Sequence, residues 1–448
     1  MNRRPQLFRA AAAIALGLLA ESGVFAQSIL LHGGTVHTVS GETLSPGDVL
    51  IKDGKIAAVG ANLSAPDAKV IDVTRQHVYP GMIELDTALG LSEIEAVRAT
   101  QDTTEVGDYK PDVESWIAFN PDSEMIAVTR ANGIAYTEPA PQGGVVAGVS
   151  GVVALSGWTP EDMTIKHPAA LHLYWPEMSV DTRGRRGGGG GGGRRGMGAN
   201  AGSADEQAKE RKLKMKALDD FFLEARAYAK SRDAIAKGGV PDPGINPPWE
   251  AMLPVVRGQI PIMVHASDIR QIKAAVAWAQ TNDYKIVIVG GRDAWKAADL
   301  LASRKIPVVY EAIFDVPAHD FDAYDVSFAA PAALTKSGVT VVFSSGPTST
   351  DAQFARNLPY FAAQAVAFGL PAEQALKGVT LYPAQILGVA DRLGSIEPGK
   401  EATLFVSDGD ILDIRSNVKH LWVAGKEVSL ESRHTRLYEK YKNRPKAN

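Results

Sequence analysis

Two carboxylates and one histidine stand in short apolar runs and have the residue types that bind a metal ion. Glu84 and Asp86 lie two residues apart in the extended stretch "MIELDTA" (82–88), so their side chains share one face of a strand. His265 comes at the end of a second apolar run, "IPIMVHA" (260–266). Carboxylate oxygens and imidazole nitrogens are ligands for Zn²⁺, Fe and Mn. The structural alternative is that the acidic pair bonds to neighbouring backbone and that His265 is a satisfied pocket histidine.

Polar residues beside other strand-like runs are candidates for lining a pocket. Ser344, Ser345 and Thr348 follow one such run and offer hydroxyl groups. His319 lies in the acidic stretch "VPAHDFDAYD" (316–325), and loops of this kind carry function when a rigid scaffold positions them. The alternative for His319 is an ordinary solvated loop.

Several other chemistries are excluded by the residues present. The chain has no cysteine, so it has neither a thiol nucleophile nor a disulfide. No Gly-x-Ser-x-Gly motif occurs, and the glycines of "PQGGVVAGVSG" (141–151) lack the Lys-Ser/Thr of a phosphate-binding loop. The net charge of −4 argues against a nucleic-acid partner. We therefore expect a small-molecule substrate or ligand, and the residues assign no catalytic side chain.

Strand patterns at both ends of the chain enclose a middle part in which strands and helices alternate. Residues 28–78 and 397–430 contain short alternating segments, with a hairpin turn at "KDGK" (52–55). Across residues 79–396, helical runs separate the strand-like runs, which predicts parallel βα units. The sequence thus predicts an α/β fold, a distorted (β/α)8 TIM barrel with a composite β-sandwich domain built from both ends of the chain.

Some local expectations follow from the same patterns. We expect a single helix over residues 371–388 and an amphipathic barrel helix over residues 213–233. His167 and His172 are expected to flank a loop. A Gly/Arg-rich insertion at residues 183–200 is predicted to be a flexible loop, because consecutive glycines cannot pack a core.

The two termini carry segments outside the folded domains. Residues 1–26 have the positive start, the short apolar stretch (11–20) and the small residues before a cleavage site near Ala26 that are typical of a signal peptide. The apolar stretch is shorter than the roughly 20 residues of a permanent membrane anchor. We therefore expect a periplasmic or extracellular protein, exported by the Sec or the twin-arginine route, with a basic tail at residues 431–448.

Two longer phrases carry a resemblance to a known family. "VIDVTRQHVYPGMIELDT" (70–87) and "TLYPAQILGVADRLGSIEPGKEATL" (380–404) resemble the amidohydrolase superfamily, in its imidazolonepropionase-like branch. The likeness extends over most of residues 28–428. It implies a metal-binding barrel that is entered through Pro80 and Gly81, and the hydrolysis of non-peptide C–N bonds with a divalent metal cofactor.

Most metal ligands of that family are replaced in this chain. The family usually has His-x-His after the first strand, a carboxylated lysine or glutamate after the fourth, histidines after the fifth and sixth, and aspartate after the eighth. The His-x-His pair falls here on Asp86 and Ala88, and the fifth-strand histidine is His265. The sixth-strand histidine falls on Gly290 or Gly291, and the eighth-strand aspartate on Ser345 or Gly346. Glu84, Asp86 and His265 remain as a conceivable replacement set for zinc, iron or manganese.

Two functional hypotheses follow. The first is an exported metal-dependent amidohydrolase that acts on C–N bonds with an altered metal site. The second is a pseudoenzyme, a catalytically silent barrel that binds a small molecule or pairs with a related amidohydrolase as a homo- or hetero-oligomer. The loss of the His-x-His pair at Asp86-Thr87-Ala88 favours weak or absent metal-dependent activity.

Overall fold

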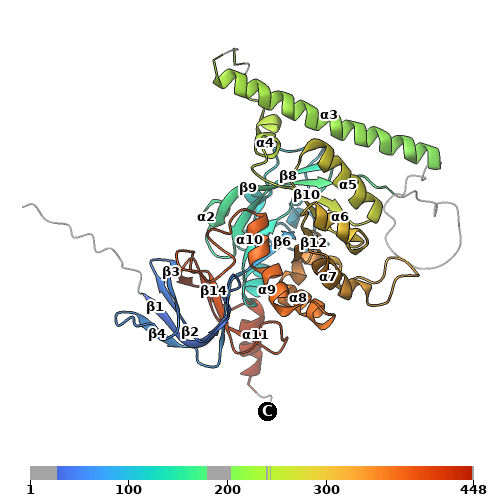
Figure 1. Cartoon of the computed structure of the whole chain (residues 1–448). Coiled ribbons are helices and arrows are strands. Elements are labelled where there is room, and N and C mark those ends of the chain that lie inside the picture. Colours follow the sequence, from blue (N-terminus) through green and yellow to red (C-terminus); the bar gives the residue numbers. More distant parts are fainter. Residues whose placement is uncertain (1–27, 179–202, 239–240, 243, 446–448) are drawn as a thin grey trace, which may run out of the picture.

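Two eight-stranded sheets organise the protein, one drawn from both ends of the chain and one from its middle. Figure 1 shows the first sheet beside the larger helix-covered body. The structure is a computed structural model that describes residues 28–178, 203–238, 241–242 and 244–445. The predicted signal peptide (1–26) and the predicted Gly/Arg-rich loop (183–200) lie outside the described residues.

The first sheet joins N-terminal and C-terminal strands. Its strands are β1 (Ile29–Val36), β2 (Leu44–Lys52), β3 (Lys55–Gly60), β4 (Lys69–Asp72), β5 (His77–Pro80), β14 (Leu404–Ser407), β15 (Val418–Val423) and β16 (Lys426–Glu427). Their order is β16-β15-β14-β5-β1-β2-β3, with β4 paired to β1. The two ends of the chain meet where β14 pairs antiparallel with β5. This confirms the composite domain, because neither end contributes a complete sheet.

The second sheet is a nearly closed barrel. Its strands are β6 (Met82–Thr87), β7 (Ile134–Pro139), β8 (Val146–Ala154), β9 (Thr164–Tyr174), β10 (Ile262–Ala266), β11 (Ile286–Gly290), β12 (Val308–Tyr310) and β13 (Val341–Phe343), in that spatial order. The Ser344 hydroxyl, just after β13, donates to the Leu85 carbonyl on β6 at 2.6 Å and ties the two edge strands together. The distorted barrel fold is confirmed.

The distortion lies in β8, which runs antiparallel to both of its neighbours. A crossover between parallel strands needs about a dozen residues or more. The segments on either side of β8, residues 140–145 and 155–163, are too short for that. The chain therefore reverses twice, and β9 again runs parallel to β10, as the remaining barrel strands do.

Helices cover the barrel sheet. The α-helices are α1 (Glu124–Arg130), α2 (Pro160–Met163), α3 (Ala204–Ala236), α4 (Pro247–Val256), α5 (Ile269–Asn282), α6 (Ala298–Ser303), α7 (Val326–Lys336), α8 (Leu358–Ala367), α9 (Ala372–Val379), α10 (Leu381–Ile386) and α11 (Arg433–Lys442). Short 3₁₀ helices are η1 (Arg98–Thr100), η2 (Ser115–Ala118), η4 (Ala294–Ala297), η5 (Ala312–Phe314) and η6 (Asp351–Asn357). In the described part of the chain, none of these helices has the length and apolar character needed to span a bilayer.

The predicted helix at residues 213–233 is part of the longer α3. A capping box of Ser203 and Glu206 starts it, and Leu218, Phe222 and Ala225 bury one face against the barrel. Figure 1 shows α3 lying across one end of the body. Leu213, at the start of the predicted range, is 59% exposed, and the buried residues of α3 begin at Leu218.

Two local predictions were wrong. The single helix over residues 371–388 is broken at Thr380 into α9 and α10. Pro383 lacks an N–H and its ring would clash with the carbonyl four residues earlier, which disfavours one continuous helix there. The loop expected around His172 is instead strand β9. Pro168 argued against a strand, although the residues after it alternate as strand residues do.

Stacked rings fill the junction between β1, β5 and β14. His37 and Tyr79 stack with ring centres 4.2 Å apart, and Tyr79 stacks on Phe405 at 5.3 Å. His37 Nε2 lies 2.9 Å from His77 Nδ1. Burial, followed by the charge of His77, lowers the pKa of His37 to about 4. The composite sheet thus depends on a neutral imidazole at the line where both ends of the chain meet.

We expect this histidine to weaken the fold in acid. The folded protein keeps His37 neutral down to about pH 4, whereas the unfolded chain protonates it near pH ~6.5. Between these values the unfolded state binds more protons, so the free energy of unfolding falls as the pH falls. Urea unfolding at pH 7 and pH 5 should show a smaller loss for His37→Gln than for the wild type. His420→Gln, an exposed histidine bonded to Glu427, is the matched control. Equal losses in wild type and His37→Gln would refute this role.

Candidate metal centre

Ionisable side chains gather at one end of the barrel. In a barrel of parallel strands the carboxyl ends of the strands open on a common mouth, where side chains from different strands converge. Six such side chains lie at or just after strand ends: Glu84 and Asp86 on β6, Glu138 on β7, His172 on β9, His265 on β10 and Glu311 after β12.

Glu138 holds two of these residues at once. Its Oε1 lies 2.7 Å from His172 Nε2, and its Oε2 accepts the Asp86 backbone N–H at 2.9 Å. Asp86 has a φ of 51°, a left-handed conformation that costs energy for a residue other than glycine. The bond from Glu138 stabilises this turn of the chain. A donated Nε2–H leaves His172 Nδ1 with a free lone pair, which is the arrangement of a metal-binding histidine held by a second carboxylate.

Three ligand atoms form a compact triangle. His172 Nδ1 and His265 Nε2 are 3.0 Å apart, and each lies 3.7 Å from Asp86 Oδ1. An ion with tetrahedral ligands at ~2.0–2.1 Å separates its ligand atoms by about 3.4 Å. The three separations bracket that value, so these residues fit a divalent metal ion with one position left open.

The Asp86 carboxylate has fewer hydrogen-bond partners than a buried carboxylate needs. Its side chain is fully buried, and no donor among the described residues bonds to either carboxylate oxygen. The adjacent Glu311 carboxyl can supply a hydrogen only when it holds a proton. Burial and then the charge of Glu311 raise the pKa of Asp86 well above its usual value. A buried carboxylate without donors is costly, and a bound cation would remove that cost.

The two histidines have opposite electrostatic surroundings. Burial, and then the neighbouring His172, lowers the pKa of His265 well below its usual value, which keeps its ring neutral. Burial acts in the same direction on His172, but the charge and hydrogen bond of Glu138 outweigh it, so the pKa of His172 is raised. Metal binding at Nδ1 would release the proton that His172 otherwise tends to hold.

The site opens to solvent only at one edge. The His265 side chain is 10% exposed, while those of Asp86 and His172 are fully buried. The Tyr174 ring stacks on His265 with ring centres 3.9 Å apart. The Gln142 side chain donates to the Pro347 carbonyl and links two loops over the barrel mouth.

Glu84 lies apart from the triangle. Its Oε1 accepts hydrogen bonds from the Ser345 backbone N–H at 2.7 Å and the Ser345 hydroxyl at 2.6 Å. Burial raises the pKa of Glu84 to about 8. Ser345 stands where the resemblance places the eighth-strand aspartate, so here this position bonds to a carboxylate instead of supplying one. Of the three predicted ligands, the structure brings Asp86 and His265 together and holds Glu84 on Ser345.

The sixth-strand position has no room for a ligand. β11 ends at Gly290, which has a φ of 86°. A Cβ atom on Gly290 would lie 2.5 Å from Ser267 Oγ and 3.6 Å from Glu311 Oε2. A side chain at Gly290 would therefore clash with Ser267, whereas Glu311 would be at an ordinary contact distance.

The other predicted residues have separate places. The Ser344 hydroxyl is buried and bonds to backbone carbonyls of β6, so it closes the barrel sheet. Thr348 is exposed and bonds to Asp351, where it shapes a loop at the rim.

His319 belongs to a second cluster. Its Nε2 lies 3.7 Å from Asp293 Oδ2, and Asp322 completes a group with ligand atoms close enough to share an ion. However, the Lys296 ammonium lies 2.9 Å from Asp293 and 3.5 Å from Asp322. Since this lysine already neutralises both aspartates, an ion there would have to displace it.

The sequence analysis missed His172, Glu138 and Glu311. A usable signal existed for His172, because "AALHLYW" (169–175) alternates apolar and polar residues and places His172 near a strand end. It stands on the fourth strand of the barrel sheet, where the resemblance implies a lysine or glutamate ligand. Glu138 and Glu311 had no comparable signal, because their roles depend on contacts between strands far apart in the sequence.

We expect Glu138→Gln to weaken metal binding roughly 10- to 100-fold. The amide oxygen of Gln can accept one hydrogen bond, either from the Asp86 N–H or from His172. The NH₂ group would then face the other donor, so either Asp86 or His172 loses the bond that holds it in position. Competition with a chromogenic chelator measures the affinity. Glu401→Gln, a partly buried glutamate that pairs with Arg392, is the control. Unchanged affinity in Glu138→Gln would show that this carboxylate does not position the ligands.

Comparisons with known proteins agree with the fold. Residues 260–428 match the model of the Amidohydrolase family. The Amidohydrolase tasK of Hapsidospora irregularis is 24% identical over 408 residues, 85% of this chain, but the match spans only 39% of that relative's length. A D-hydantoinase of Geobacillus stearothermophilus is 42% identical over 62 residues, 14% of this chain and 13% of that protein.

A solved structure gives the same result over a longer span. The crystal structure of an amidohydrolase from Thermotoga maritima MSB8 has a TM-score of 0.75 and 28% sequence identity, and the match covers 90% of this chain and 99% of that one. The C-terminal part of the chain thus matches the Amidohydrolase family model, and nine tenths of the chain share the fold of a solved amidohydrolase.

Proposed function

We propose that this protein is a divalent-metal-dependent hydrolase of amide-type C–N bonds, with one ion held by Asp86, His172 and His265. The observation that carries the proposal is the buried, donor-free Asp86 carboxylate at 3.7 Å from two histidine nitrogens. The names of two relatives, an amidohydrolase and a hydantoinase, support the class of bond. The narrower assignment to the imidazolonepropionase-like branch and the export predicted from residues 1–26 stay predictions.

The proposal replaces the ligand set drawn from the sequence. Loss of the His-x-His pair at Asp86 and Ala88 suggested a degenerate site, since one imidazole cannot hold zinc or iron against water. His172 supplies a second imidazole, and Asp86 supplies an anionic ligand. Two nitrogens and one oxygen make the same number of protein ligands as known catalytic zinc sites have.

The chain's own residues can perform the remaining steps. A divalent ion supplies polarisation of the scissile carbonyl and lowers the pKa of a water molecule. Glu138 fixes the ring of His172, and Tyr174 packs on the ring of His265, so both imidazoles are held before substrate binds. Burial raises the pKa of Glu311 towards neutrality. Glu311 is therefore suited to take a proton from water and pass it to the leaving nitrogen.

Metal content is the decisive experiment. The full chain is stripped with a chelator, dialysed against zinc, manganese or iron, and analysed for bound metal. We expect about one ion per chain, lost in Asp86→Asn and His172→Gln. His319→Gln is the matched control and should keep the ion. If His319→Gln lost it instead, the ion would belong to the cluster around Asp293.

Activity completes this test. Hydrolysis of a panel of cyclic and linear amides should stop on chelation and return with added metal. Glu311→Gln should keep the ion but lose roughly 100-fold or more in kcat, because general acid–base catalysis contributes about that much. A protein that binds no metal, or that binds metal and hydrolyses no amide, would leave the silent barrel as the remaining function.

A further inference from the structure

The C-terminal helix α11 lacks a packing surface in the monomer. A capping box of Ser432 and Thr435 starts it, but none of its residues, Arg433–Lys442, is buried. It adjoins the barrel at its N-terminal end, where Arg436 pairs with Glu124 on α1 at 3.6 Å and where Arg433 and His434 line a cavity together with residues of α1. Isolated helices shorter than ~12–15 residues are marginal in water, and most helical stability comes from packing. A helix of 10 residues with no buried side chain therefore needs a partner surface.

One face of α11 is built for docking. His434, Leu437, Tyr438 and Tyr441 stand at positions i, i+3, i+4 and i+7, which lie on one side of a helix. Leu437 is 37%, Tyr438 63% and Tyr441 59% exposed. This spacing is that of helices that place an apolar face into a groove of another protein.

Unpaired cations border that face. Arg433 and Lys440 are seven residues apart and lie close to one side of the helix, and Arg444 follows its end. Throughout the described residues, no carboxylate forms a salt bridge with any of these three. Lys440 lies over the ring of Tyr441 at 5.5 Å, so the helix presents apolar and aromatic groups beside positive charge that no carboxylate of the described residues pairs with.

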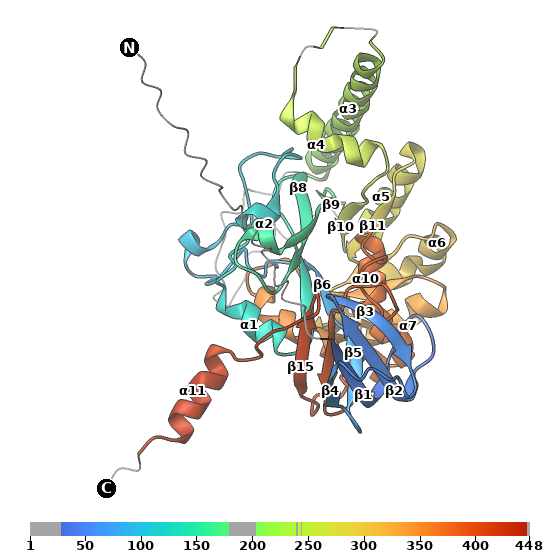
Figure 2. The ribbon, with the colours of Figure 1, turned by 90° about the vertical axis from the view of Figure 1, so that its left-hand side faces the viewer.

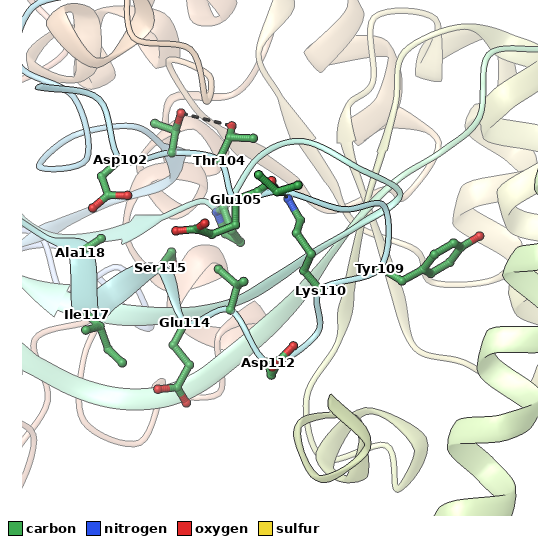
Figure 3. Close-up of a pocket in the computed structure, with 14 residues that line it drawn as sticks. Asp102, Thr104, Glu105, Tyr109, Lys110, Asp112, Glu114, Ser115, Ile117 and Ala118 are labelled. Carbon is green, nitrogen blue, oxygen red and sulfur yellow. Dashed lines mark hydrogen bonds between the residues drawn. The ribbon is translucent and has the colours of Figure 1, made fainter. Parts of the chain in front are cut away.

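A groove of the opposite charge lies on the loop after β6. Residues 102–118 and Pro141 enclose a cavity of about 730 Å³, shown in Figure 3. Four carboxylates line it, and none of them is in a salt bridge within the described chain: Asp102, Glu105, Asp112 and Glu114. Lys110 also lines it, but its ammonium donates to the carbonyls of Glu105 and Gln142. We call this cavity the acidic groove.

Apolar side chains complete the acidic groove. Val106 is 98% exposed and Ile117 is 55% exposed, and both lie on its lining. Large apolar side chains gathered in this way beside charged ones mark interaction sites. The acidic groove therefore offers apolar side chains to contact the apolar face of α11 and carboxylates to pair with its cations.

We propose that α11 of one copy docks in the acidic groove of a second copy, and that the exchange is reciprocal. Figure 2 shows α11 standing out from the body, on the same side of the molecule as the light-blue segment that contains residues 102–118. A two-fold axis facing that side places each helix opposite the groove of the other copy. A helix that docked in its own groove would have to fold back from the position seen in Figure 2.

Charge exchange tests the pairing. Arg433→Glu/Lys440→Glu reverses the helix, and Glu105→Lys/Asp112→Lys reverses the groove; all four side chains are exposed, so both variants should fold. Sedimentation of the full chain at micromolar concentration should show a dimer for the wild type. Each double variant should dissociate at least about tenfold more readily, because like charges then face each other. A mixture of the two variants should dimerise again, since every helix then meets a groove of opposite charge.

Controls separate this contact from general charge effects. Lys212→Glu/Lys230→Glu changes two exposed lysines of α3 and should leave the dimer intact. A chain ending at Ser429 should be monomeric with an unchanged thermal transition of the barrel. A monomeric wild type, or a dimer unaffected by both reversals, overturns the proposal. Dimers that weaken in both variants without recovery on mixing overturn the pairing of helix with groove.

Discussion

The bonds of Glu138 are the constraint on which the site depends. One carboxylate accepts from the Asp86 backbone and from His172, so it fixes two of three ligand residues together. Asp86 adopts a left-handed conformation that ordinary strand residues avoid, and this turn aims its carboxylate at the two imidazoles. The barrel brings the strand ends close together, and Glu138 sets the final orientation. The same bonds leave His172 Nδ1 free for a ligand.

Two positions at the barrel mouth that the sequence resemblance assigns to metal ligands hold other residues in this chain. The position that the resemblance gives to the sixth-strand histidine falls on Gly290 or Gly291, and a Cβ on Gly290 would clash with Ser267. The eighth-strand aspartate has become Ser345, which bonds to Glu84. Three carboxyl groups, those of Glu84, Asp86 and Glu138, are buried at this mouth. A cation is the simplest partner for so many carboxylates with so few donors.

The two ends of the chain serve different purposes. Strands from both ends form one sheet, joined where β14 meets β5 and filled by the stack of His37, Tyr79 and Phe405. Beyond that sheet, α11 extends without burying any residue and carries the free cations that the acidic groove lacks. The composite sheet is complete within one copy of the chain, whereas α11 has no surface in that copy that buries its side chains. In the proposed dimer, α11 of the second copy would contact residues 102–118, which follow strand β6 and its proposed ligand Asp86.

The sequence by itself determined the barrel and the composite sheet, and it predicted two residues of the proposed ligand set, Asp86 and His265. Those inferences rest on period, turn residues and strand ends, which are local properties. Only the tertiary structure decided that His172 faces His265, that Glu84 turns to Ser345, and that Glu138 and Glu311 belong to the site. These residues are between 34 and 261 positions from their partners. Which side chains meet at such separations is set by strand order and register, which no local sequence pattern records.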